Sequence, residues 1–352
     1  MKTVVFFGIY DGEYSRNSVL MQGFQDNGWN VLECSVDPRK YRGWTKYSML
    51  RKKWKELAVK PDILFVATPG QSIAWLAKFL FPRGLIIFDA FTSLYDTNVF
   101  DRKRYGRWSL GAMHDFLLDW YSVRVAKYVT VDTAENAQYF HKTFGILSGR
   151  IIPVFVGSNA KLSVTKSTNR TGKFIVHFHG TYIPLHGIEY IIRAAKLIET
   201  EKGISFRIIG RGQEYEKMMI VQEELKPENV EYFPQMPFGD LVNMMAEADV
   251  VLGIFGITDK AGRVIPNKVF EGMSLGKAII TENSPAIREL LTDNENVIFA
   301  MPGYDKSLAE KILLLKKNTE LREKIGRNAK DLFEKELQPK DLVSKLLLKL
   351  NI

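Results

Sequence analysis

The sequence has a single cysteine, only five histidines and no long apolar run. One cysteine excludes a disulfide scaffold and a cysteine-based zinc site, which fits a cytoplasmic setting, and we expect Cys34 to be buried. No apolar stretch reaches the roughly 18 residues that a membrane-spanning helix needs. His177 and His179 alternate on a predicted strand and are expected to be structural, so no metal site is predicted. The N-terminal stretch MKTVVFFGIYDG is too short for a signal peptide and predicts a first strand.

What the sequence does contain is the composition of a globular protein, with 352 residues, 46% hydrophobic and 25% charged. This length predicts two domains of ordinary size. Apolar strands alternate with helices in both halves, which indicates parallel α/β sheets. The polar, aperiodic stretch 157–172 is the predicted linker. The first strand is not followed by GxGxxG, which lowers the case for a dehydrogenase.

The net charge of +9 is concentrated in the N-terminal part. Residues 1–160 hold 21 basic and 14 acidic side chains, whereas the remainder holds 28 and 26. The densest segment is Arg39–Lys60, with nine bases, one acid and interleaved aromatic residues. Such a segment suits an anionic membrane surface, a solvated helix or nucleic acid. Because no nucleic-acid-binding motif accompanies it, we expect a membrane surface and no nucleic acid.

The most informative stretch is Arg263–Leu291, RVIPNKVFEGMSLGKAIITENSPAIRELL. Pro266 suits the first turn of a helix, because its φ is fixed and its missing N–H would be unpaired there anyway. The helix predicted over Asn267–Leu275 directs free N–H groups at whatever precedes it, which favours an anion. Lys268 adds a positive charge, and Glu271 adds an acceptor for hydroxyl groups. The stretch therefore predicts a sugar-nucleotide site; the alternative is a solvated helix face between two turns.

The segment PNKVFEGMSLGKAII followed by SPAIREL resembles the donor-binding signature of glycosyltransferase family 4, the group 1 sugar transferases. The resemblance extends over nearly the whole chain and is more specific in its C-terminal half. It implies the GT-B fold, in which two Rossmann-like, doubly wound α/β domains face a cleft. Residues 1–160 would then form the acceptor-binding domain and residues 161–338 the nucleotide-sugar-binding domain. A final helix, about 339–352, would pack back on the first domain.

A first loop of the second domain departs from the family pattern. In HGTYIPLHG, Gly180 is followed by Thr181, and His186 precedes the next glycine. Family members typically have an arginine and a lysine at these two positions, and both grip the donor diphosphate. A hydroxyl and a titratable imidazole replace them here. His186 would either donate a hydrogen bond to phosphate or cap the turn.

Two further loops follow the family pattern more closely. Gly210 and Gly212 bracket Arg211, as in the turn that lies beneath the nucleotide, and Arg211 is a candidate phosphate contact. The segment PQMPFGDL, which contains Pro237, corresponds to the part whose backbone reads the nucleobase. The resemblance adds the two residues beside Lys268 to the donor-binding set: Asn267 and Val269.

Position 263 carries a charge reversal. Family members often have two glutamates eight positions apart, the second touching the ribose and the first the donor sugar. Glu271 matches the second, but Arg263 stands at the first. Arg263 either grips the diphosphate, restoring charge that is missing at Thr181, or marks a weakened enzyme; the intact helix favours compensation. Arg263, Lys268 and Arg211 would then stabilise a departing nucleoside diphosphate.

The predicted acceptor side is less specific. Asp89 ends a strand and would orient an acceptor hydroxyl, act as a base or cap the next turn. Asp96 follows in the same region. Gly8 and Arg16 flank the loop after the first strand, where open α/β sheets bind ligands.

The resemblance therefore implies a metal-independent, retaining glycosyltransferase without a cofactor. It would move a hexose from a nucleoside-diphosphate sugar to a glycan or lipid-linked acceptor, in cell-surface polysaccharide or glycolipid synthesis. We expect a cytoplasmic protein, with residues 39–60 binding the inner face of the membrane. The alternatives are a catalytically silent GT-B scaffold and a sugar-nucleotide epimerase or hydrolase of the same fold.

Overall fold

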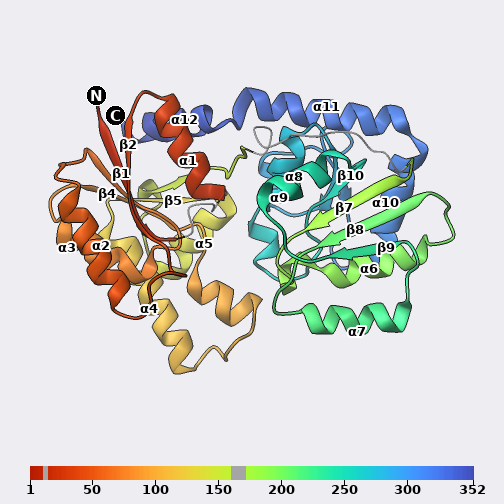
Figure 1. The fold of residues 1–352 in the computed structure, drawn as a ribbon, viewed down its shortest axis with the longest axis horizontal. Helices are drawn as coiled ribbons and strands as arrows, with labels where there is room; N and C mark the ends of the chain where they lie inside the picture. Colours follow the sequence, from red (N-terminus) through yellow and green to blue (C-terminus); the bar gives the residue numbers. More distant parts are fainter. Residues whose placement is uncertain (11–14, 160–171) are drawn as a thin grey trace. The chain divides into compact units, whose positions relative to one another are not determined.

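The computed structural model describes residues 1–10, 15–159 and 172–352. In these ranges the chain forms two compact units, residues 1–157 with 337–352 and residues 158–336 (Figure 1). The predicted domain boundary at residue 160 and most of the predicted linker lie outside the described residues. Each unit contains a parallel six-stranded sheet, so the predicted α/β class is confirmed.

The sheet of the first unit has the strand order β2-β1-β3-β4-β5-β6. Its strands are short apolar runs, because a parallel sheet is covered by helices on both faces. The order reverses beside β1, and the carboxyl ends of strands at such a point are where α/β sheets bind ligands. The strands are β1 (Thr3–Ile9), β2 (Asn30–Val36), β3 (Ile63–Val66), β4 (Leu85–Asp89), β5 (Tyr128–Val131) and β6 (Ile151–Pro153).

Two groups of helices cover this sheet. Val5 and Phe7 of β1 share one core cluster with the helices α2 to α5. Phe6 points the other way and contacts Phe24 of α1, which in turn packs against the C-terminal α12. A Cβ at Gly23 would lie 2.2 Å from the Pro339 carbonyl oxygen, so only glycine allows this approach. The helices are α1 (Ser15–Asp26), α2 (Thr45–Glu56), α3 (Ala74–Leu80), α4 (Leu110–Val125), α5 (Ala134–Phe144) and α12 (Pro339–Leu350).

The sheet of the second unit has the order β12-β11-β10-β7-β8-β9, with the first strand of the unit, β7, between β10 and β8. This is the order of the doubly wound dinucleotide-binding fold, whose switch point lies at the carboxyl end of the first strand. The strands are β7 (Phe174–His179), β8 (Ile204–Ile209), β9 (Val230–Phe233), β10 (Val250–Leu252), β11 (Ala278–Glu282) and β12 (Ile298–Ala300).

The helix predicted over Asn267–Leu275 is observed as α9, Asn267–Ser274. One difference concerns Pro266, which precedes α9 as its N-cap with extended backbone instead of lying in the first turn. Its carbonyl accepts the Val269 N–H at 2.9 Å, so the helix begins at Asn267. The helices are α6 (Ile188–Leu197), α7 (Tyr215–Leu225), α8 (Phe238–Ala246), α9 (Asn267–Ser274), α10 (Asp305–Lys317) and α11 (Thr319–Glu336).

Candidate functional site

Three of the predicted donor loops meet at the carboxyl edge of the second sheet. The loop after β7 is joined to the turn after β8 by the hydrogen bond from Tyr182 N to Arg211 O, 3.2 Å. The same loop accepts the Phe255 N–H on the His186 carbonyl at 3.1 Å. Backbone contacts therefore fix these loops relative to one another.

Two glycines make the loop contact possible. A Cβ at Gly210 would lie 2.1 Å from the Gly180 carbonyl oxygen, and one at Gly212 would lie 2.6 Å from Tyr182 N. Gly210 also has a φ of 134°, which other residues rarely adopt. The predicted G-x-G turn is thus present, and its glycines are required already for packing against the Gly180 loop.

Lys268 lies in the first turn of α9 and is only 3% exposed. Among the described residues its Nζ has no hydrogen-bond partner, and it lies 4.1 Å from the centre of the Phe178 ring. A Cβ at Gly180 would be 3.1 Å from this Nζ, so the ammonium lies against the loop after β7. Burial lowers the pKa of Lys268 to about 7, against a smaller opposing effect of Glu271. A buried ammonium in this state would be stabilised by an incoming anion.

Glu271 lies one turn later on α9 and is also buried. Its Oε2 is 2.9 Å from His179 Nε2, and His179 Nδ1 is 3.1 Å from His177 Nε2. The sequence indicated a structural pair of histidines and missed their link to Glu271. Their alternation at the end of a strand that shares its edge with α9 was the available signal.

His186 adopts the turn-capping arrangement. Its Nδ1 lies 2.5 Å from the Thr181 carbonyl oxygen. Because a carbonyl only accepts hydrogen bonds, Nδ1 carries the hydrogen, and Nε2 of the neutral ring is an acceptor. A hydrogen bond from His186 Nε2 to phosphate therefore requires the protonated ring. Thr181 itself is exposed.

The two arginines of the predicted site occupy different environments. The Arg211 side chain is 70% exposed, stacks on Tyr215 at 4.9 Å and lies 3.8 Å from Glu216. Arg263 is half-buried in a 3₁₀ turn, Ala261–Arg263, shortly before α9. Arg263 thus lies nearer in sequence to the start of α9 than Arg211 does, and its side chain is less exposed.

The remaining predicted donor residues have mixed positions. Asn267 is half-buried as the first residue of α9, and Pro237 is an exposed N-cap of α8. Val269 is fully buried and donates its N–H to Pro266, so it stabilises the helix, and these contacts do not support a donor contact for it.

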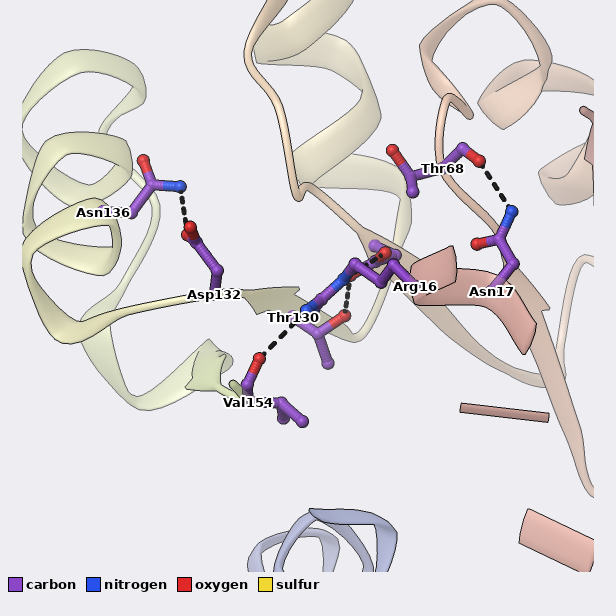
Figure 2. A network of polar contacts seen from close by, with 8 residues as sticks. Arg16, Asn17, Thr68, Thr130, Asp132, Asn136 and Val154 are labelled. Carbon is purple, nitrogen blue, oxygen red and sulfur yellow. Dashed lines mark hydrogen bonds and ion pairs between the residues drawn. The ribbon is translucent and has the colours of Figure 1, made fainter. Parts of the chain in front are cut away.

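In the first unit, Arg16 and Asp89 form a closed buried network. Figure 2 labels Arg16 with two further members of this network, Thr130 and Val154. Arg16 Nε and Nη2 both donate to the Asp89 carboxylate at 2.8 Å, and Nη1 donates to Val154 O at 3.0 Å. Thr130 Oγ1 donates to Asp89 Oδ1 at 2.7 Å. Arg16 was predicted to lie where a ligand binds, but its guanidinium has no exposed surface. The contacts of Asp89 favour a structural role over that of a base.

The other predicted acceptor residues are also buried. A Cβ at Gly8 would lie 2.2 Å from the Tyr10 ring, which explains the glycine. Asp96 begins a π-helical turn, Asp96–Asp101, and its N–H donates to Ser93 Oγ at 3.0 Å. Residues 11–14 of the loop between Gly8 and Arg16 lie outside the described residues.

The basic segment 39–60 forms α2 and the turns beside it. Of its aromatic side chains, Trp44 is exposed, whereas Tyr47 and Trp54 pack against the core. Trp44 and the cations Arg51, Lys52 and Lys55 line a surface hollow of about 730 Å³ together with Trp75 and Phe79 of α3. In the part of the chain that the structure describes, no helix is long and apolar enough to cross a membrane, and no cluster of three or more potential metal ligands is found.

Comparison with known proteins identifies the class. Residues 161–332 match the family model of the group 1 glycosyl transferases. The matched part, just under half of the chain, covers the donor loops, α9 and Glu271. Over 213 residues it is 26% identical to an uncharacterized glycosyltransferase, MJ1178, of Methanocaldococcus jannaschii, a match that covers 60% of this chain. The match spans about half, 54%, of that curated relative.

Two solved structures share the fold over the whole chain. HepE of Anabaena, in complex with UDP and glucose, superposes with a TM-score of 0.75 at 14% identity and covers 100% of both chains. Sucrose-phosphate synthase of Thermosynechococcus elongatus has a TM-score of 0.75 at 12% identity, over 100% of this chain and 99% of its own. The GT-B fold implied by the resemblance is thereby confirmed, whereas the family 4 subdivision stays a prediction.

Proposed function

We propose that the protein is a glycosyltransferase that transfers a hexose from a nucleoside-diphosphate sugar to a hydroxyl of a glycan or lipid-linked acceptor. The observation that carries the proposal is Lys268, a buried ammonium with no hydrogen-bond partner in the described ranges, at the N-terminus of α9. A helix N-terminus and a desolvated lysine both favour phosphate. Glu271, three residues later, supplies an acceptor for ribose hydroxyls.

In the proposed reaction the acceptor oxygen bonds to the anomeric carbon while the bond from that carbon to the phosphate oxygen breaks. The acceptor proton passes to the departing phosphate, on the same face of the sugar, so the configuration is retained. Lys268, Arg263 and the N–H groups of α9 neutralise the charge that develops on the diphosphate. Retention, and activity without a metal, are expectations from the family resemblance; product stereochemistry by NMR and activity in EDTA test them.

Donor binding separates this proposal from a silent scaffold. Calorimetry with UDP, GDP, ADP and CDP should detect binding of at least one nucleotide, lost in Lys268→Ala and Glu271→Ala. Lys277→Met is the matched control, because Lys277 is also desolvated but follows α9 instead of opening it. Failure of all four nucleotides to bind, with both alanine variants unchanged, would favour the scaffold.

The substrates follow from a second experiment. UDP-sugars are the first donors to test, since HepE was solved with UDP and glucose. Mass spectrometry of the products from a panel of sugar nucleotides and acceptors should detect a glycosylated acceptor. Free sugar or an epimerised nucleotide, formed equally well without acceptor, would favour the hydrolase or epimerase instead.

We also propose that the first unit binds an anionic membrane surface, which would bring a lipid-linked acceptor within reach. The hollow between α2 and α3 combines Arg51, Lys52 and Lys55 with exposed aromatic rings, as interfacial binding requires. Further exposed apolar side chains lie before and along α4, from Trp108, which is 91% exposed, through Leu110 and Met113 to Leu117. The acids of α4, Asp115 and Asp119, are buried and do not oppose this surface.

Binding to liposomes tests the membrane proposal. Replacing Arg51, Lys52 and Lys55 by glutamine should reduce sedimentation with vesicles containing phosphatidylglycerol. The control replaces three exposed lysines of the second unit, Lys306, Lys317 and Lys324, and so changes the net charge equally. Equal loss in both variants would mean a general charge effect, and no loss in either would refute the proposal.

A further inference from the structure

Two histidines of β7 connect the interior of the second unit to Glu271. Along one face of this strand, Ile175 packs in an apolar cluster, His177 is fully buried, and His179 lies at the carboxyl end. His177 Nε2 is 3.1 Å from His179 Nδ1, and His179 Nε2 is 2.9 Å from Glu271 Oε2. The three side chains form one continuous polar chain that ends at the carboxylate.

The hydrogen positions in this chain follow from its surroundings. Desolvation by burial holds the pKa of His177 well below its usual value, so this ring is neutral. Nδ1 of His177 has no hydrogen-bond partner among the described residues. A hydrogen there would be a buried unpaired donor, whereas a bare lone pair costs less. The hydrogen of His177 is therefore on Nε2 and points to His179 Nδ1.

This arrangement determines the tautomer of His179. In a neutral His179 ring whose Nδ1 accepts from His177, the hydrogen lies on Nε2, the atom that is 2.9 Å from Glu271 Oε2. This contact is not aligned as a hydrogen bond, and Oε2 has no hydrogen-bond partner among the described residues, so the carboxylate stays an acceptor for hydroxyl groups. An apolar pair of residues would fill the same space without the desolvation that two buried imidazoles require.

We propose that His177 and His179 are positioning residues that hold the Glu271 carboxylate in place for the ribose hydroxyls of the bound nucleotide. The inference rests on the proposed function, because it presumes a nucleoside diphosphate at α9. A free glutamate side chain has several rotamers, and ordering it on binding weakens affinity. The histidine pair fixes the rotamer in advance, so the nucleotide does not have to.

The test compares ribonucleoside diphosphates with their 2′,3′-dideoxy analogues, which lack the hydroxyls that Glu271 would accept. UDP, GDP, ADP and CDP are each measured by calorimetry, with the matching dideoxy compounds. His179→Leu should weaken binding of the best ribonucleotide by roughly tenfold and leave its dideoxy analogue unchanged. In the Glu271→Ala background, His179→Leu should have no further effect. His177→Leu should act in the same direction, more weakly.

Polar variants keep the test informative where a leucine variant does not fold. His179→Gln places an N–H near the position of Nε2 and should stay within about threefold of the wild type, whereas the shorter His179→Asn should lose the preference for ribose. Ile175→Val, on the same face of β7, controls for a change in apolar packing that leaves both histidines in place. Equal weakening of ribonucleotide and dideoxynucleotide would show a merely structural pair and overturn the inference. Absence of any nucleotide binding in the wild type would overturn the proposed function itself.

Discussion

The two units place a buried basic side chain and a buried carboxylate at comparable positions, but they use them differently. In the first unit, Arg16 and Asp89 satisfy each other, with Thr130 and Val154 completing the network (Figure 2). In the second unit, Glu271 Oε2 lies 2.9 Å from His179 Nε2, and neither this oxygen nor the Lys268 ammonium has a hydrogen-bond partner among the described residues. The first pair is closed and the second is open.

The difference separates stability from binding. Replacing either member of a closed buried ion pair strongly lowers the stability of the folded protein, because the other member is left as an uncompensated charge. An open ammonium destabilises the free protein and is stabilised when an anion arrives. The same kind of side chain, at the same end of a similar sheet, thus has a structural role in one unit and a proposed binding role in the other.

The largest effect is expected from breaking the closed pair. Asp89→Ala should lower the free energy of unfolding of the first unit by about 3–5 kcal/mol, because Arg16 is left buried and unpaired. Hydrogen exchange of peptides from β1, β4 and β5 during urea titration measures this unit separately. A stability loss below about 1 kcal/mol, together with loss of transferase activity, would instead favour the predicted role of Asp89 as a base.

At the open site of the second unit, Lys268→Met should not lower the free energy of unfolding at pH 8. The substitution removes a desolvated amine without leaving a partner unpaired. The same variant should weaken nucleoside-diphosphate binding by about 10- to 100-fold, the effect of one or two lost charged hydrogen bonds. Urea titration and calorimetry on one preparation give both values. A variant that is strongly destabilised would mean that Lys268 is structural, like Arg16.

The sequence predicts the two regions unequally well. The alternation of apolar strands with helices in both halves was predicted and is observed, because apolar runs ended by turns are a local signal. The opening of α9 was equally visible, since Pro266 and Lys268 lie only two positions apart in the sequence. The ion pair of Arg16 with Asp89 joins residues 73 positions apart, and no local pattern indicates such a contact.

The contact between His179 and Glu271 was likewise not predictable from the sequence. Period-two spacing places His177 and His179 on one face of a strand, but only the packing of α9 on the sheet shows what they face. Exposure was also hard to predict in the basic segment, where Trp54 of α2 packs on Phe7, while Trp44, just before the helix, is on the surface. Long-range packing decides such cases, and a single sequence does not contain it.

The pH dependence of binding offers a smaller but more specific test of the open site. The pKa of Lys268 is about 7 in the free protein against its usual 10.5, so the amine is mostly neutral at pH 8. An approaching diphosphate favours the charged form, and binding must therefore take up a proton. Affinity should fall by up to about tenfold per pH unit from pH 8 to pH 9. Calorimetry in buffers of different ionisation enthalpy measures the uptake.

The stability of the free protein should follow pH in the opposite sense. Between about 7 and 10.5 the unfolded chain holds more protons at Lys268 than the folded chain, so this residue's contribution to stability rises with pH. Lys268→Met should abolish both dependences. If the variant retained the proton uptake of binding, another group would be the one that titrates.

The smallest predicted effect concerns Arg263, which stands where the family often has a glutamate. If Arg263 supplies charge to the diphosphate, Arg263→Glu should weaken UDP binding several-fold, and less so at high salt, because a half-buried charge is partly screened. The UDP affinity of Arg263→Gln should lie between those of the wild type and Arg263→Glu. Arg211→Gln, which changes a more exposed arginine, should reduce UDP affinity less than Arg263→Gln does. Comparing UDP with UDP-glucose separates the two interpretations of the charge reversal. If Arg263→Glu binds both ligands more weakly, the result supports compensation by the arginine. If it binds UDP unchanged and UDP-glucose more tightly, the new carboxylate restores a sugar contact. The arginine would then mark a weakened enzyme.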